Sequence, residues 1–257
     1  MKDKKPVTAF DDPDFMHSRE ARVIRILSEY IDPEKRLRER DIGHTVVFFG
    51  SARTRPDGGG DEKEARYYNM AADFAFALAN LSKEIEKETG HLFYICTGGG
   101  PGIMEAANLG ATRAGMESIG LNIDLPYEQA PNKYITPELI FKFHYFFMRK
   151  LWFLYHAKAI VIFPGGYGTM DELFETLTMV QTRKLEKMNI PILLYDREFW
   201  SDIINFDRLV KDGLISPEDT GLFHYFSDIQ EGIDILRPRL TTLMKNIDYY
   251  LKMRFPI

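Results

Sequence analysis

The sequence predicts an α/β protein whose core is a Rossmann-like, doubly wound parallel sheet with helices on both faces. Short runs of β-branched and apolar residues alternate along the chain with longer segments that suit helices. Residues 159–163 form one such run, and it is uniformly apolar, as expected of a strand buried on both faces. This run and the run at 93–97 both lead into a glycine-rich corner and then into a helix start. That order is typical of this fold class.

The first half of the chain contains one predicted βαβαβ unit after an N-terminal extension. Residues 1–15 look disordered, and residues 18–40 indicate one or two charged helices interrupted near Pro33. The expected strands are residues 44–50, 91–97 and 118–123. The expected helices are residues 61–88 and 103–114, with a polar, glycine-rich loop at 53–60 before the first. Apolar residues at helical spacing support the longer helix: Ala65, Tyr68, Ala72, Phe76 and Ala79.

The second half continues the alternation of strands and helices. The expected strands are residues 159–163, 190–195 and, as a last short strand, 222–226. The expected helices are residues 138–156, 169–187 and 229–254, with an interruption at Pro238 in the last. The segment 138–156 is richer in aromatic residues than one buried helix stripe needs. Most of them are expected in the core, and others would line a subunit interface or stack on a purine.

The composition predicts one domain with terminal additions. A chain of 257 residues with 45% hydrophobic residues can bury a sizeable core, so we assign residues 44–257 to one nucleotide-binding domain and residues 1–43 to a partly disordered or helical extension. The net charge of −5 offers no basic surface for a nucleic acid. No apolar stretch approaches the roughly 20 residues that span a bilayer, and the N-terminus lacks the apolar core of a signal peptide. With a single cysteine, Cys96, we expect a cytoplasmic protein without nucleic-acid or membrane partners.

The corner at residues 164–172 carries the most chemistry. It supplies three glycines, Gly165, Gly166 and Gly168. Glycines let the backbone turn sharply and approach a ligand, and the free N–H groups at a helix start attract a phosphate. Thr169 is the expected cap of the following helix, whose first turn would then hold Asp171 and Glu172. A carboxylate would thus stand beside a phosphate-binding loop.

A second corner, at residues 98–104, repeats this arrangement. It supplies Gly98, Gly99, Gly100 and Gly102. Ser51 follows the first strand, so all three segments should collect at the carboxyl edge of the sheet, where such folds bind ligands. A nucleotide-sized ligand is favoured over the alternative that both corners are ordinary tight turns. The dinucleotide fingerprint fails, because Ile103 and Asp171 stand at its third glycine position, and this disfavours an NAD enzyme.

Together these segments resemble the LOG family, the phosphoribohydrolases often labelled "lysine decarboxylase-like". The resemblance runs from about residue 46 to 195 and rests on four marks: Phe49-Gly50-Ser51, the loop 98–104, Met148-Arg149-Lys150 and the segment 164–172. It implies hydrolysis of the N-glycosidic bond of a nucleoside 5′-monophosphate to free base and ribose 5-phosphate. The substrate would be AMP or an N6-substituted relative such as a cytokinin riboside 5′-monophosphate. The long ends, Pro101 and Glu105 depart from short plant-type members, which affects the expected base more than the reaction.

The same resemblance implies roles for single residues. Arg149 and Glu172 would be the catalytic pair. The substrate-binding residues would be Ser51, Gly98, Gly99, Gly100, Gly102, Met104, Glu105, Met148, Lys150, Gly165, Gly166, Gly168 and Thr169. The family also implies a homodimer or an assembly of dimers. We expect no cofactor, and the scattered histidines, none paired at metal-ligand spacing, predict no metal site.

Each of these residues also has a plainer interpretation. Glu172 suits stabilisation of an oxocarbenium-like state or activation of water, but a first-turn carboxylate can also simply stabilise a helix start by about 0.3–1 kcal/mol. Arg149 and Lys150 suit a phosphate or a leaving base, and could otherwise be a solvated basic pair. Glu105 would contact the base or merely open its helix.

Three classes of function remain open from the sequence. The first is the phosphoribohydrolase. The second is a non-catalytic nucleotide-binding or sensing protein, against which the presence of both Arg149 and Glu172 weighs, because phosphate binding alone needs no carboxylate. The third is a decarboxylase using pyridoxal phosphate, which requires a Schiff-base lysine and an acidic partner for the ring nitrogen. No such constellation stands out in the sequence.

Overall fold

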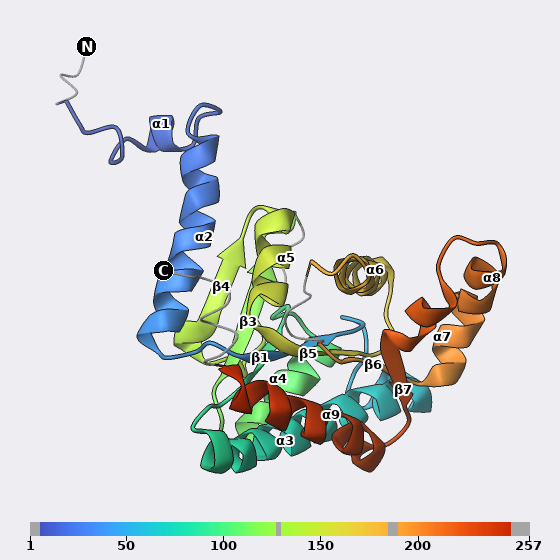
Figure 1. Cartoon of the computed structure of the whole chain (residues 1–257). Coiled ribbons are helices and arrows are strands. Elements are labelled where there is room, and N and C mark those ends of the chain that lie inside the picture. Colours follow the sequence, from blue (N-terminus) through green and yellow to red (C-terminus); the bar gives the residue numbers. More distant parts are fainter. Residues whose placement is uncertain (1–5, 127–129, 185–189, 248–257) are drawn as a thin grey trace.

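The computed structural model describes residues 6–126, 130–184 and 190–247, and its centre is a seven-stranded parallel sheet (Figure 1). The strands lie in the order β4-β3-β2-β1-β5-β6-β7. Their bounds are β1 Thr45–Phe49, β2 Tyr94–Thr97, β3 Ser118–Ile123, β4 Ile140–Phe143, β5 Ala157–Ile162, β6 Ile192–Tyr195 and β7 Phe223–Phe226. The predicted α/β fold class with a parallel, Rossmann-like sheet is confirmed.

The strand order reverses at β1, the strand that follows the N-terminal extension. β1 pairs with β2 on one side and with β5 on the other, so that Phe48 lies opposite both Thr97 and Val161. Every residue of β1 and β5 is buried, and both sequences are apolar except for Thr45 and Lys158. The chain leaves β1 toward one face of the sheet and leaves β5 toward the other, the arrangement at which α/β sheets bind ligands.

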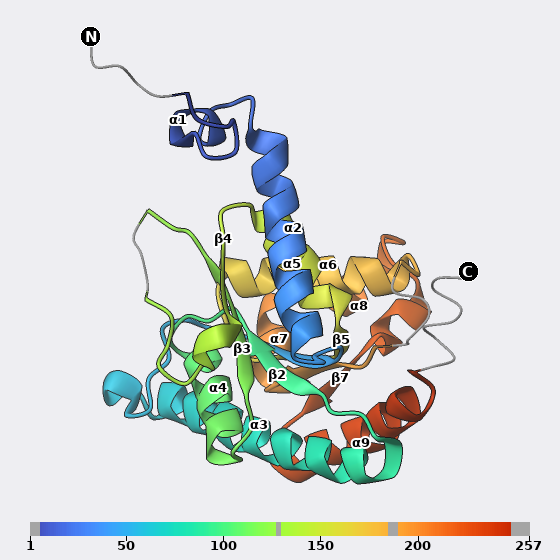
Figure 2. The ribbon, with the colours of Figure 1, turned by 90° about the vertical axis from the view of Figure 1, so that its left-hand side faces the viewer.

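Helices cover the two faces of the sheet in separate groups (Figures 1 and 2). One face carries α3 Glu62–Thr89, α4 Ile103–Arg113 and α9 Ile229–Lys245, and the other carries α2 Arg22–Glu39, α5 Phe146–Tyr155 and α6 Tyr167–Gln181. Each group has its own apolar core. Successive residues of β1 point to opposite faces, so Phe48 joins the core under α3 and Phe49 joins the core under α5.

The predicted helix at 138–156 is wrong in its first half. The structure has there a 3-10 turn, the edge strand β4 and then α5: Pro137–Leu139, Ile140–Phe143 and Phe146–Tyr155. In β4, Phe141 and Phe143 are buried while Lys142 is exposed, which is the two-residue period of a strand with one covered face. What fixes the strand is its parallel pairing with β3, a contact between segments that the aromatic content does not signal.

Two prolines that the sequence predicts as helix interruptions lie inside continuous helices. Pro33 lies in α2 and Pro238 in α9. Because proline has no N–H group, Pro33 leaves the carbonyl of Glu29 without its usual helical donor. The indole N–H of Trp152 donates to that oxygen at 3.1 Å, which satisfies the carbonyl and ties α2 to α5.

Several segments differ from the sequence prediction, and others lie outside the residues that the structure describes. Residues 196–221, for which the sequence predicts no element, contain α7 Arg197–Ile203, α8 Phe206–Lys211 and a 3-10 turn at Pro217–Gly221. A short helix, α1 Pro13–Met16, begins within residues 1–15, which were expected to be disordered. Residues 1–5 and the predicted helix ends at 187 and 254 lie outside the described residues. Within the described ranges, no helix combines the length and apolarity needed to cross a membrane.

Candidate active site

The loops that follow β1, β2 and β5 are tied together at the carboxyl edge of the sheet. The N–H of Ser51 donates to the carbonyl of Pro164 at 3.0 Å, and the N–H of Ile103 donates to the carbonyl of Ser51 at 2.9 Å. Ser51 therefore lies between the two glycine corners, at the edge where the topology places a ligand.

Two glycines at this edge permit approaches that a side chain would block. Gly102 has a φ of +71°, and a Cβ there would overlap the carbonyl oxygen of Ser51. A Cβ on Gly98 would collide with the guanidinium of Arg149 and would lie 2.7 Å from the sulfur of Met104. Glycine at 98 thus lets the predicted catalytic Arg149 and the predicted substrate-binding Met104 lie directly over the backbone.

The helix after β5 begins earlier than predicted. α6 begins at Tyr167 with Gly166 as its N-cap, so the prediction that Thr169 caps this helix is wrong. Tyr167 and Gly168 already have helical geometry, and Thr169 is buried inside the first turn. Glu172 consequently lies in the second turn rather than the first. Glu172 is therefore too far along α6 to stabilise the helix start through the helix dipole, since that stabilisation is confined to the first turn.

Glu172 is a buried carboxylate with a strongly shifted proton affinity. Only 8% of the residue is exposed. Burial raises the pKa of its carboxyl to about 7, opposed by the cations of Lys150 and Arg149 and reinforced by the neighbouring acids Glu175 and Asp171. A carboxyl with this pKa can hold or release a proton near neutral pH, which is the property of a general acid or base.

Lys150 is surrounded by carboxylates of α6. Its ammonium lies 2.6 Å from Glu175 Oε2, 2.8 Å from Asp171 Oδ2 and 3.7 Å from Glu172 Oε1. Burial disfavours the charge, but hydrogen bonds to Asp171 and Glu175 and the nearby Glu172 outweigh it, so the pKa of Lys150 is raised. The solvated basic pair considered from sequence is therefore incorrect for Lys150, which holds α5 against α6.

Arg149 points away from Lys150 and is anchored by backbone oxygens. Its Nε donates to the carbonyl of Leu121 at 2.6 Å and its Nη2 donates to the carbonyl of Gly98 at 3.4 Å, while the guanidinium lies over the ring of Phe153. Burial lowers its pKa, whereas Glu172 acts to raise it. Among the described residues no carboxylate forms an ion pair with Arg149. A largely buried, unpaired guanidinium with spare N–H groups is a strong candidate for binding an anionic ligand.

Several of the other predicted site residues lie away from Arg149 and Glu172. Met148 is packed in the apolar core, and Gly168 is exposed with open space around it. The carbonyls of Gly99 and Gly100 accept hydrogen bonds from the side chain of Asn132, at 3.3 and 3.0 Å, so these glycines are held by the loop before β4. Sequence reasoning missed Asn132, since nothing marks it as a partner of a corner 32 residues earlier.

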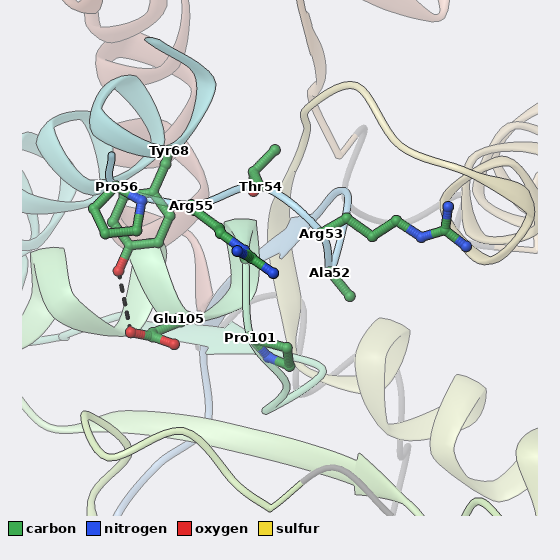
Figure 3. Close-up of a pocket in the computed structure, with 9 residues that line it drawn as sticks. Ala52, Arg53, Thr54, Arg55, Pro56, Tyr68, Pro101 and Glu105 are labelled. Carbon is green, nitrogen blue, oxygen red and sulfur yellow. Dashed lines mark hydrogen bonds between the residues drawn. The ribbon is translucent and has the colours of Figure 1, made fainter. Parts of the chain in front are cut away.

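Gly102 and Glu105 face the other side of the corner, toward α3. They line a pocket of about 420 Å³ together with the loop at 52–56, Tyr68 and Pro101 (Figure 3). Neither Arg149 nor Glu172 lines it. The sequence prediction also missed Arg53 and Arg55 of this pocket. Their position immediately after the first strand, beside Ser51, was the available signal. Within the described ranges no group of three or more histidine, cysteine or acidic residues is arranged to hold a metal ion.

A sequence model of the protein family described as "Possible lysine decarboxylase" matches residues 104–236, just over half of the chain. The chain belongs to this family. The matched region contains Arg149, Lys150 and the whole corner at 164–172, so the LOG resemblance of these segments is confirmed.

Curated relatives of this LOG-family chain carry a consistent name. Cytokinin riboside 5′-monophosphate phosphoribohydrolase LOG3 of Arabidopsis thaliana is 27% identical over 165 residues, covering 62% of this chain and 69% of that protein. A probable enzyme of the same name, LOGL3 of Oryza sativa subsp. japonica, is 27% identical over 170 residues, covering 62% and 74%. LOG1 of Arabidopsis thaliana is 38% identical over 64 residues, which span only 24% of this chain and 29% of that protein.

Solved structures share the fold of the LOG-family chain. The protein TM1055 has a TM-score of 0.52 at 22% identity, with 76% of this chain and 99% of that chain covered. The molybdenum cofactor binding protein from the phototrophic bacterium Rippkaea orientalis has a TM-score of 0.51 at 16% identity, covering 77% and 98%. At these identities the likeness concerns the fold.

Proposed function

We propose that the chain hydrolyses the N-glycosidic bond of a nucleoside 5′-monophosphate, releasing the free base and ribose 5-phosphate. Two groups carry this proposal: Arg149, a largely buried guanidinium without an ion pair among the described residues, and Glu172, a buried carboxyl whose pKa is raised to about 7. The names of the curated relatives support the same reaction. The substrate class would be AMP or an N6-substituted AMP such as a cytokinin riboside 5′-monophosphate.

The reaction places two electrostatic demands on the site. As the bond from C1′ to the base nitrogen breaks, its electron pair leaves with the base and positive charge develops on the ribose. Ionised Glu172 would stabilise that charge or take a proton from the water that adds to C1′. Arg149 would bind the phosphate or offset the negative charge on the departing base, which finally takes up a proton.

The phosphate would bind at the corner that follows β5. Gly166 is exposed with open space around it, Gly165 packs against Thr169 and Ser51, and α6 begins directly after them. Free N–H groups and the positive end of the helix dipole both favour an anion at such a start. Glu172, one turn further along the same helix, would then stand beside the sugar.

Decarboxylation with pyridoxal phosphate fits this site less well. A lysine that forms a Schiff base must lose its proton to become a nucleophile. Lys150 instead has hydrogen-bonded carboxylates at 2.6 and 2.8 Å, which stabilise its charged form. These contacts disfavour the decarboxylation that the family's description suggests.

We further propose that the protein is a homodimer that associates through α2 and α5. Exposed apolar side chains gather on these two helices: Val23, Ile24, Leu27, Ile31, Phe146, Phe147 and Leu151. Leu27 is 52% exposed and Phe147 55%, which is unfavourable for side chains of this size in water. Light scattering should show a dimer for the wild type and a monomer for Leu27→Asp combined with Phe147→Asp. Leu214→Asp, at an exposed position beyond α8, is the control that should stay dimeric.

The reaction itself is tested by incubating the purified protein with AMP and a panel of other nucleoside monophosphates and separating the products by chromatography. We expect free base and ribose 5-phosphate from the wild type, and strongly reduced release from Arg149→Ala and Glu172→Gln. Retained nucleotide binding with no base released from any monophosphate would contradict the proposal and favour a nucleotide-binding protein.

A further inference from the structure

The pocket on the α3 side of the carboxyl edge is separate from the Arg149–Glu172 site. Its walls are the loop at 52–56, Tyr68 of α3, and Gly102 and Glu105 at the start of α4. Neither Arg149 nor Glu172 lines it, and the backbones of Ser51 and Gly102 are packed so closely that a Cβ on Gly102 would overlap the carbonyl of Ser51. At about 420 Å³ the pocket falls within the range of small-molecule sites, roughly 300–1,000 Å³.

Arg55 gives the mouth of this pocket a positive charge that no ion pair among the described residues neutralises. Arg53 and Arg55 are both exposed, and neither forms an ion pair with any carboxylate of the described residues. Arg55 extends toward Pro101, whereas Arg53 points to the other side of the loop (Figure 3). The start of α4 faces the same pocket through Gly102, and its backbone dipole adds further positive character. These groups favour an anion, and a guanidinium suits the two oxygens of a phosphate.

The loop that carries the arginines is fixed by its own hydrogen bonds. The N–H of Arg53 donates to the side-chain oxygen of Ser51 at 3.1 Å, and the hydroxyl of the buried Thr54 donates to the carbonyl of Ser51 at 3.4 Å. Pro56 further restricts the backbone after Arg55. A ligand would therefore meet arginines on a backbone that is already ordered, which reduces the entropy lost on binding.

The inner wall of the pocket offers an oriented carboxylate. The hydroxyl of Tyr68 donates to Glu105 Oε1 at 3.2 Å and holds the side chain in place. No described residue donates to the second oxygen, Oε2. A fixed carboxylate with free acceptor capacity is the group that nucleotide-binding folds use for sugar hydroxyls. The guanidinium of Arg55 at the mouth and the carboxylate of Glu105 at the wall together fit a ligand that has a phosphate at one end and hydroxyl groups at the other.

We propose that this pocket binds a phosphorylated ribosyl group, with the phosphate on Arg55 and the sugar hydroxyls on Glu105. The ligand would be free ribose 5-phosphate or the corresponding part of a nucleotide. The pocket is a binding site only, since it holds neither member of the proposed catalytic pair. Glu105 and Met104, neighbours in the sequence, thereby serve different sites, because successive helix residues point about 100° apart.

The proposal is tested by equilibrium dialysis of radiolabelled ribose 5-phosphate against the full chain. We expect Arg55→Met and Glu105→Gln each to remove one bound equivalent per chain, while Arg149→Ala leaves that equivalent in place. Arg22→Met, at an exposed arginine on α2, is the matched control and should bind as the wild type does. Glu105→Gln preserves the side-chain shape, and circular dichroism of each variant confirms folding.

The outcomes separate this pocket from the proposed active site. Unchanged stoichiometry and affinity in both Arg55→Met and Glu105→Gln would overturn the proposal, as would loss of all binding in Arg149→Ala. If no monophosphate is hydrolysed but one equivalent is still lost in Arg55→Met, the pocket stands and the hydrolase proposal fails. Competition by AMP in the Arg149→Ala variant would identify the nucleotide as the source of the ribosyl phosphate, and its absence would identify the free sugar phosphate.

Discussion

The two sides of the carboxyl edge of the sheet carry their charges in different ways. On the side of α5 and α6, Lys150 contacts three carboxylates and Glu172 is buried among them. On the side of α3 and α4, Arg53 and Arg55 are exposed and form no ion pair among the described residues. Buried, mutually coupled charges shift pKa values and suit chemistry, whereas exposed, uncompensated charges suit the binding of a counterion. The comparison suggests a reacting site and a binding site on opposite sides of Ser51.

The largest expected difference between the two sides follows from replacing the buried carboxylate of Glu172. Glu172→Gln should lower base release from AMP by about 10²–10⁴-fold, the usual contribution of a group that handles a proton or a developing charge. Glu105→Gln, which changes the carboxylate on the other side, should have a much smaller effect on kcat. Equal losses of kcat in the two variants would show that both sides form one catalytic site.

The same substitution should stabilise the protein at alkaline pH. The folded-state pKa of Glu172 is about 7, above its ordinary value of 4.5, so the folded chain holds this proton more tightly than the unfolded chain does. Stability is therefore lost as the pH rises from about 4.5 to 7, by up to about 3 kcal/mol. Thermal unfolding should give Glu172→Gln a higher Tm than the wild type at pH 8 and a similar one at pH 4.5. A lower Tm at pH 8 would mean that the ion pair with Lys150 outweighs burial.

A third test concerns the coupling between α5 and α6. Lys150 lowers the pKa of Glu172 from 3.7 Å away, so Lys150→Met should raise it further. Because both proposed roles of Glu172 need the ionised form, activity should increase with pH through this pKa. The midpoint of that increase should move up by about one pH unit or more in Lys150→Met. An unmoved midpoint would assign the titration to another group. Lys142→Met, on the edge strand β4, is the control.

The smallest expected effect lies on the α3 side. Tyr68→Phe removes the hydrogen bond to Glu105 and should lower the free energy of unfolding by about 1 kcal/mol. Chemical denaturation measures this change. The pH dependence of base release should stay that of the wild type, because Tyr68 does not contact the α5–α6 side. A shifted pH profile in Tyr68→Phe would contradict the separation of the two sides.

Particular residues show where sequence reasoning succeeded and where it failed. The strand at Ser118–Ile123 matches its prediction at both ends, because Ile119, Leu121 and Ile123 recur at the two-residue period of a strand. The edge strand β4 was missed because its phenylalanines lie close in sequence to the aromatic residues of α5, and the whole segment was therefore interpreted as one helix. Pro33 was misjudged because the donor that replaces its N–H, Trp152, comes from a segment more than 100 residues away.

The candidate site shows the same division. The glycine corners and the charged residues beside them were visible as local patterns, and strand topology placed Ser51 and both corners at one edge. The start of α6 was misplaced by two residues, because glycine and tyrosine before Thr169 adopt helical geometry without a sequence signal. The split between Met104 and Glu105 was not foreseen, since it depends on what packs around each face of α4.

By itself, then, the sequence determined most of the alternation of strands and helices, the two glycine corners and the family, because these depend on local periodicity and on short motifs. Only the tertiary structure decided the proton affinity of Glu172, the partners of Lys150 and the side of the edge that each charge faces. The physical reason is that burial and electrostatic coupling arise between residues of different elements. Their magnitude depends on distances and on excluded water, which a linear pattern does not contain.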